Sequence, residues 1–136
     1  MNMNLDAQNL LSTFLLSKSW EQKMRLLMQL GKNLSPLTEV EKTDKNQVKG
    51  CESQVWLVST KQDDQWYFKA TSEARLIQGL LAVLLTRING LTAKEIKEID
   101  LDDWFQQLGL AKQLSSSRRD GLSAIFKKVK AVTEQT

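Results

Sequence analysis

The chain of 136 residues contains no histidine and one cysteine, and its formal net charge is +3, from 19 basic residues against 16 acidic ones. The missing histidine excludes Ser-His and Cys-His catalytic pairs and His-ligated zinc, and the single cysteine excludes an internal disulfide, a CxxC redox pair and an all-cysteine metal site. The length predicts a single domain over residues 1–136 with one buried core.

Composition also argues against two classes of partner. The positive charge is mild, and the basic residues are not interleaved with aromatic ones, so we expect no nucleic-acid binding. The longest apolar stretch, residues 80–85, is far shorter than the ~20 residues of a membrane-spanning helix, so we expect no membrane partner. The first residues lack the features of a signal peptide, and a lone thiol suits a reducing compartment, which predicts a cytoplasmic protein.

Two helices are predicted first in the chain. Apolar residues at helical spacing predict a helix over residues 5–16. A capping box at residues 19–22 then opens a second helix. This helix should end by Leu34, because Pro36 disfavours helical backbone in the residue before it. The polar and charged residues 37–47 are expected to form a long connection.

The hydrophobic period changes in the next part of the chain. Residues 54–60 and 66–71 are rich in β-branched and aromatic side chains and predict two strands, joined by a polar hairpin loop at residues 61–65. A short strand at residues 46–48 could pair with the outer side of the first, which would make three antiparallel strands. Residues 49–52 would then form the turn between the short strand and its neighbour.

The remaining elements are helical. Ser72 is a candidate N-cap for a helix through Ile88, which is apolar on nearly all sides and therefore predicted to be central and buried. Three further helices follow: residues 92–99, residues 102–109, and a last helix capped within residues 115–117. This order of elements predicts an α+β fold, in which a small three-stranded antiparallel sheet packs against several α-helices.

Cys51 is the strong nucleophile of the chain, and two interpretations of it are open. A free cysteine is most often a small buried hydrophobe. Its setting favours a second interpretation, because Gly50 lets the backbone turn sharply and leaves space beside the thiol. The positive charge of Lys49 favours the thiolate and the negative charge of Glu52 opposes it, so these two charges do not determine the pKa of the Cys51 thiol. Without histidine or a second cysteine, the thiol can still accept a sulfane sulfur atom, whereas dithiol redox chemistry is excluded.

The residues around this cysteine resemble those of a known family. Residues 50–56, Gly-Cys-Glu-Ser-Gln-Val-Trp, resemble the glycine-cysteine motif of the SufE/CsdE family and the strand that follows it. The similarity continues in one order along nearly the whole chain, at residues 20–23, 30–31, 72–73, 79–83, 108–110 and 114–122. It implies a small antiparallel sheet flanked by helices, similar to the IscU-type iron–sulfur scaffold fold.

The same resemblance implies a function. Proteins of this family accept persulfide sulfur from a pyridoxal-phosphate-dependent cysteine desulfurase, of the SufS or CsdA type, and stimulate that enzyme. They pass the sulfur to a downstream acceptor, toward iron–sulfur cluster assembly or another sulfur pathway. The chain would thus be a sulfur carrier rather than an enzyme, and it would need no cofactor or metal of its own.

Candidate site residues follow from the matching motifs. The acceptor cysteine corresponds to Cys51, and the Ser-Arg-x-x-Gly-Leu pattern puts the family's arginine at Arg118, a candidate support for the cysteine loop. Four neighbours frame the cysteine and are candidates for loop and partner contacts: Lys49, Gly50, Glu52 and Gln54. Glu52 stands where SufE itself has glutamine, which leaves the branch of the family and the donor desulfurase open.

A persulfide exposed to bulk thiols would be reduced, so Cys51 is expected to be sheltered in the free protein. Three apolar neighbours, Val48, Val55 and Trp56, are close enough in sequence to form this shelter. An alternative function is a non-catalytic interaction module with a structural cysteine. It would use the uneven charge of the chain, with six basic and two acidic residues in 111–136 against two basic and five acidic ones in 92–107.

Overall fold

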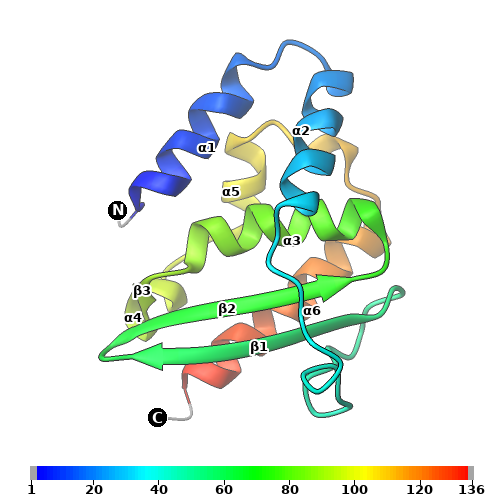
Figure 1. The fold of residues 1–136 in the computed structure, drawn as a ribbon. Helices are drawn as coiled ribbons and strands as arrows, with labels where there is room; N and C mark the ends of the chain where they lie inside the picture. Colours follow the sequence, from blue (N-terminus) through cyan, green and yellow to red (C-terminus); the bar gives the residue numbers. More distant parts are fainter. Residues whose placement is uncertain (1–2, 135–136) are drawn as a thin grey trace.

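The computed structural model describes residues 3–134, and helices cover one face of its antiparallel sheet (Figure 1). The elements in chain order are α1 (Leu5–Leu16), α2 (Trp20–Lys32), β1 (Val55–Gln62), β2 (Gln65–Ser72), α3 (Arg75–Ile88), β3 (Leu91–Thr92), α4 (Ala93–Lys97), α5 (Leu101–Gln107), the 3-10 turn η1 (Ala111–Gln113) and α6 (Ser116–Thr133). The predicted α+β class with a three-stranded antiparallel sheet is confirmed. Within residues 3–134, no helix is long and apolar enough to cross a membrane.

Helix α3 lies at the centre of the fold, between the sheet and the pair α1 and α2 (Figure 1). Its residues from Gly79 to Leu85 are all buried, which confirms the prediction made from its apolar circumference. Helix α2 approaches α3 at Gly79, where a Cβ atom would overlap the carbonyl oxygen of Leu27. A glycine at this position therefore allows the close contact of the two helices.

The sheet has the order β1-β2-β3, and both pairings are antiparallel. Alternate residues of β1 and β2 are buried against the helices: Val55, Leu57, Trp66, Phe68 and Ala70. The register joins Val55 to Ser72 at one end and Gln62 to Gln65 at the other. This register brings the beginning of β1 next to the beginning of α3, where the candidate site lies.

The third strand differs from the prediction. It is β3, which pairs with β2 through Gln65↔Thr92 and Trp66↔Leu91. Residues 46–48 were expected to be this strand, but they contribute one isolated antiparallel bridge, Gln47↔Trp56. Strand β3 has only two residues, too few to show a period in sequence, and the turn after α3 carries it back onto β2.

Two predicted boundaries also need correction. The hairpin loop is Asp63-Asp64 rather than residues 61–65, and Asp63 has a φ of 56°, a left-handed conformation that aspartate tolerates better than most residues. Helix α3 begins at Arg75 with Ala74 as its N-cap, whereas Ser72 was expected to cap it. Ser72 ends β2 instead, because its backbone pairs with Val55.

The other predicted helices agree closely with the structure. Helix α1 has the expected bounds, and five helices have side-chain N-caps, at Asn4, Ser19, Thr92, Asp100 and Ser115. Helix α4 has the complete capping box of Thr92 and Glu95. Helices α4 and α5 differ by one or two residues at their ends from the expected ranges.

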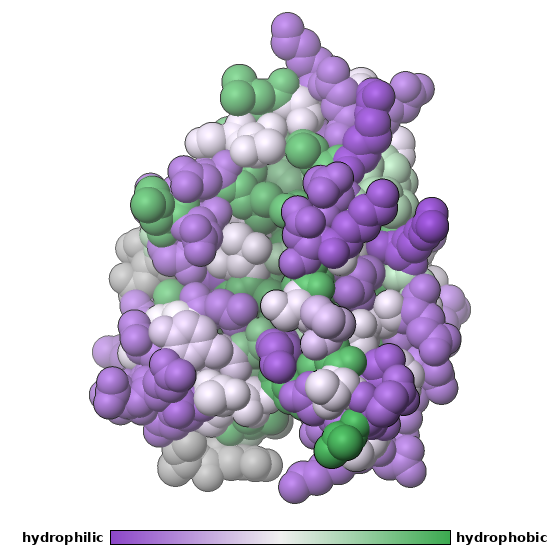
Figure 2. Space-filling view, viewed as in Figure 1, coloured by the Kyte–Doolittle hydropathy of each residue, from purple (hydrophilic) through white to green (hydrophobic). Residues whose placement is uncertain are grey.

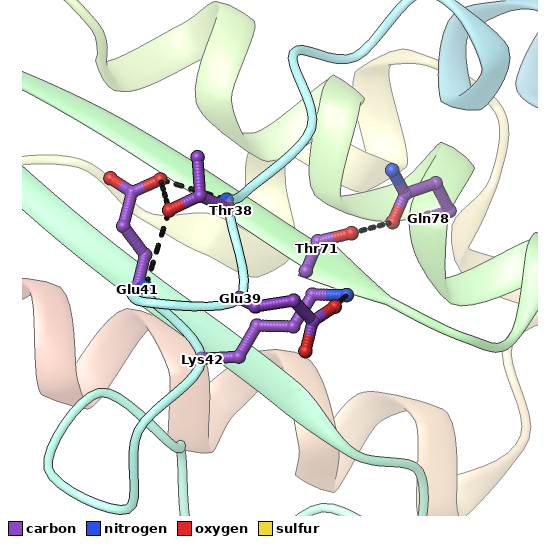
Figure 3. Close-up of polar contacts among 6 residues, drawn as sticks. All are labelled: Thr38, Glu39, Glu41, Lys42, Thr71 and Gln78. Atoms are coloured by element: carbon purple, nitrogen blue, oxygen red, sulfur yellow. Dashed lines mark hydrogen bonds and ion pairs between the residues drawn. The ribbon is translucent and has the colours of Figure 1, made fainter.

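The connection between α2 and β1 crosses the face of the sheet that the helices leave open (Figure 1). The Glu41 carboxylate lies 3.6 Å from Lys69 Nζ on β2, and Lys42 Nζ lies 5.8 Å from the centre of the Trp56 ring on β1. Thr38 donates hydrogen bonds to Glu41 from its backbone and its hydroxyl, and the backbone bond is the main reason that the pKa of Glu41 is lowered (Figure 3). These polar contacts hold the connection that precedes the candidate site.

The surface on this side of the molecule is mainly hydrophilic, with hydrophobic residues scattered among the polar ones (Figure 2). The large hydrophobic residues that are exposed in residues 3–134 include Leu15 and Leu16 at the end of α1 and Val40 in the connection. Single exposed hydrophobic residues are ordinary on protein surfaces.

Candidate functional site

Cys51 lies in a loop that is closed at its base by paired backbone. The backbone N–H of Val48 donates to the carbonyl oxygen of Val55 at 2.8 Å, and that of Leu57 donates to the carbonyl oxygen of Asn46 at 2.8 Å. Between these pairs the chain turns at Gly50, whose φ of 92° is strained for any residue with a side chain. The backbone conformation directly before the cysteine therefore requires a glycine.

The thiol of Cys51 is half-buried against α6. Its Sγ atom lies 3.5 Å from the carbonyl oxygen of Gly121, at the distance of a weak S–H···O hydrogen bond. Burial raises the pKa of the Cys51 thiol, because a thiolate loses solvation in this position. The neutral thiol is therefore favoured in this conformation, and burial rather than a neighbouring charge is the cause.

A cavity of about 370 Å³ opens beside the thiol. Three parts of the chain form its walls: the cysteine loop with the start of β1, the start of α3 and the first half of α6. The lining residues are Cys51, Glu52, Ser53, Val55, Ala74, Leu76, Ile77, Ser115, Ser117, Arg118, Gly121, Leu122 and Ile125. The cavity thus combines one nucleophile with apolar walls and a few polar groups, an arrangement typical of a ligand site.

Arg118 reaches this cavity from the first turn of α6. Its backbone N–H donates to the hydroxyl of the N-cap Ser115 at 3.3 Å, which fixes the start of the helix. Within residues 3–134, no hydrogen bond or ion pair engages its guanidinium group. Its donors are therefore free to bind an anionic group that enters the cavity beside Cys51.

The structure brings some candidate residues together and separates others. Glu52 and Arg118 line the cavity with Cys51. Lys49 and Gln54 are exposed on the surface of the loop and do not line it, and Lys49 Nζ donates to the side-chain oxygen of Gln47 at 3.4 Å.

The expected shelter is formed in part by other residues. Val55 lines the cavity and Val48 is buried nearby, but Trp56 lies on the opposite face of β1, beneath Lys42. The thiol itself contacts Gly121 of α6, and the start of α3 forms another wall of the cavity beside it. Sequence reasoning missed both elements. One signal was available: Gly121 lies inside a predicted helix, where a glycine costs about 1 kcal/mol relative to alanine and needs a packing reason.

No group of three or more His, Cys, Asp or Glu side chains within residues 3–134 could hold a metal ion. The chemistry that this site itself offers is that of a single thiol.

The fold and the site define a class: an α+β protein with one sheltered thiol, in a loop that packs on its last helix beside an arginine. A family model described as SufE, Fe-S metabolism associated domain, matches residues 8–133. The chain therefore belongs to the SufE family.

Curated relatives agree with this assignment. The sulfur acceptor protein CsdE of Escherichia coli is 41% identical over 130 residues, which cover 95% of this chain and 88% of CsdE. An uncharacterised SufE-like protein of Rhizobium meliloti is 37% identical over 129 residues, which cover 92% of each chain.

Among solved structures, the solution structure of a hypothetical protein from Thermus thermophilus matches with a TM-score of 0.79. The match covers 98% of this chain and 97% of the other, at 14% identity. At this level of identity the match supports the fold alone.

Proposed function

We propose that this chain is a sulfur acceptor. It takes sulfane sulfur from a pyridoxal-phosphate-dependent cysteine desulfurase onto Cys51, stimulates that enzyme, and passes the sulfur toward iron–sulfur cluster assembly or another sulfur pathway. The observation that carries the proposal is the position of Cys51, the one thiol of the chain, half-buried in a lined cavity. Family membership and the 41% identity to a protein named as a sulfur acceptor support it.

The proposed step needs only one thiolate. The Cys51 thiolate attacks the terminal sulfur of a persulfide on the desulfurase. A new S–S bond forms on Cys51, the S–S bond of the enzyme's persulfide breaks, and the electron pair leaves on the enzyme's cysteine thiolate. The step has no net oxidation or reduction, so it needs neither a second cysteine nor a redox cofactor.

The geometry suits a carrier that holds its cargo between two encounters. A terminal sulfur atom on Cys51 is small relative to the cavity of about 370 Å³, so it can be kept out of contact with bulk thiols. A persulfide is more acidic than a thiol and carries negative charge near neutral pH, and the Arg118 guanidinium in the same cavity can stabilise it. Arg118 is therefore proposed as the residue that supports the loaded state.

The alternative, an interaction module that uses the basic C-terminal part of the chain, has less support. Three of these basic residues make contacts within the protein. Lys128 donates to backbone carbonyls, Arg119 donates to the carbonyl oxygen of Ala111, and Lys130 Nζ lies 5.0 Å from the centre of the Phe126 ring. Their charges therefore have internal roles, which reduces the evidence for a dedicated partner surface.

Intact-mass measurement tests the proposal. The protein is incubated with a cysteine desulfurase and free cysteine and weighed under non-reducing conditions. The wild type should gain the mass of one sulfur atom, and Cys51→Ser should gain none. The matched control Ser53→Ala, which changes a neighbouring cavity residue, should keep the gain.

Parallel runs with SufS-type and CsdA-type enzymes identify the donor. Binding to both desulfurases without any gain of sulfur would support the interaction module instead. Unfolding of Cys51→Ser, checked by circular dichroism, would support a purely structural cysteine.

A further inference from the structure

The cysteine loop lies along one face of α6. Gly121 and Ala124 are three residues apart on that helix and therefore point to the same side. Gly121 meets the Cys51 thiol, and the Ala124 methyl group lies against Gly50, 3.3 Å from where a Cβ of that residue would be. These two contacts are weak, because one is a 3.5 Å bond from sulfur and the other is a contact of a single methyl group.

The next residue on the same face, one turn further along α6, makes a much stronger contact. Lys128 Nζ donates to the carbonyl oxygen of Lys45 at 3.0 Å and to that of Gln47 at 3.2 Å. These two carbonyls flank Asn46, whose own carbonyl pairs with β1. The ammonium group therefore ties the stem of the cysteine loop to the helix through two charge-assisted hydrogen bonds.

The environment of this ammonium group is partly desolvated. Burial lowers the pKa of Lys128, and the nearby charge of Lys49 lowers it further. Hydrogen bonds are worth more where water competes less for them, which applies to the part-buried bond from Lys128 to the carbonyl oxygen of Gln47.

In the conformation described, Cys51 is half-buried and its Sγ atom faces the carbonyl oxygen of Gly121 on α6. Movement of the loop away from α6 would expose more of the thiol to a persulfide on a docked protein. Contacts that hold the stem on α6 would therefore limit how often the thiol is fully exposed.

We propose that Lys128 is a positioning residue, a latch that holds the Cys51 loop on α6 and controls release of the thiol. This inference rests on the proposed function, because release of the thiol matters only if sulfur is transferred to and from a docked protein. The latch itself is a property of the free protein and can be measured without a desulfurase.

The test is the alkylation rate of Cys51 by iodoacetamide in the free protein. Lys128→Met removes the donors and keeps the length of the side chain, and it should speed alkylation by about tenfold, as expected for loss of a charge-assisted hydrogen bond. The matched control Lys127→Met removes the same charge from the adjacent, exposed position and should leave the rate unchanged. Lys128→Arg keeps a cationic donor and should restore most of the slow rate.

Amide hydrogen exchange separates a local latch from general loss of stability. In Lys128→Met, the amide of Val48, which bonds to Val55 in the loop stem, should lose protection. The amides of α3 should keep theirs. Equal alkylation of Lys128→Met and Lys127→Met would overturn the latch, and so would a uniform loss of protection that includes α3.

The two proposals can fail separately. Faster alkylation of Lys128→Met in a protein that never gains sulfur would support the latch and contradict the sulfur-acceptor function. Sulfur gain by the wild type with no effect of Lys128→Met on alkylation would do the reverse.

Discussion

Two glycines inside helices, Gly79 in α3 and Gly121 in α6, mark contacts of opposite kinds. A Cβ atom at Gly79 would overlap the backbone of Leu27 in α2, with the Leu27 carbonyl carbon only 2.9 Å away. A Cβ atom at Gly121 would lie 3.7 Å from Cys51 Sγ, an ordinary van der Waals distance. The first glycine is required for the fold, whereas the second leaves room beside a reactive atom.

The packing around the two glycines also differs, because it is tight around Gly79 and looser around Gly121. Gly79 lies where α2 crosses α3, beside fully buried side chains such as Leu27 and Leu80. Gly121 faces a half-buried thiol and a cavity of about 370 Å³, and only a few contacts hold the facing loop. Regions with few buried contacts open at lower free energy than the core, so the cysteine loop can move while the helices stay in place.

The substitution Gly79→Ala should have the largest effect on stability. The added methyl group would overlap backbone atoms of α2, which cannot move aside as a flexible side chain could, so α2 and α3 must separate. Overpacking of this kind is expected to lower the free energy of unfolding by about 3 kcal/mol. Urea unfolding followed by circular dichroism measures this loss, and a variant as stable as the wild type would contradict the tight crossing.

The same substitution at Gly121 should have a smaller effect of opposite sign. Alanine is favoured over glycine inside a helix by about 1 kcal/mol, and the contact at 3.7 Å needs no displacement, so Gly121→Ala should gain up to that amount. The new methyl group also excludes water from the thiol, so the pKa of Cys51 should rise further and alkylation at neutral pH should slow. Urea unfolding and the pH profile of alkylation check both effects, with Gly79→Ala as the matched comparison.

A destabilised Gly121→Ala protein would show that the thiol is packed as tightly as the α2–α3 crossing. An unchanged pH profile would show that Gly121 does not control the solvation of Cys51.

The smallest expected effect is the pH dependence of stability that Cys51 contributes. Its pKa in the folded protein is raised by burial above the unfolded value, which is about 8.5 for a free cysteine. The stabilising contribution is therefore complete below the unfolded pKa and is lost as the pH rises through the folded pKa. Urea unfolding should be measured from about pH 7 to about pH 10, on both sides of the unfolded pKa. Over this window the wild type should lose stability relative to Cys51→Ser. Parallel curves for the two proteins would mean that the thiol is solvated in the folded state.

Local signals in the sequence were sufficient for most of the fold. Ser19, Thr92 and Ser115 cap helices because their side chains bond to backbone only three residues away, and such contacts can be recognised in the sequence. The apolar circumference of α3 indicated a central helix for a similar reason, since burial on all sides needs apolar residues on all sides. The two long strands were recognised by their β-branched and aromatic content.

Elements whose structure depends on distant contacts were predicted less well. Strand β3 exists because residues after α3 pair with β2, and two residues carry no period of their own. Ser72 is a good candidate for the N-cap of α3, but its pairing with Val55 makes it the end of β2. In both cases a long-range backbone pairing overrides a local preference.

The sequence alone determined the chemistry of the candidate site: one thiol, no histidine, and a glycine that turns the backbone next to it. These are properties of residue types and their immediate neighbours. The tertiary structure decided the state of that thiol, because Gly121 is 70 residues away from Cys51 and Lys128 is 81 residues away from Gln47. Burial, a raised pKa and a loop held by a lysine arise only when α6 packs on the loop, since solvation depends on what surrounds a group in space.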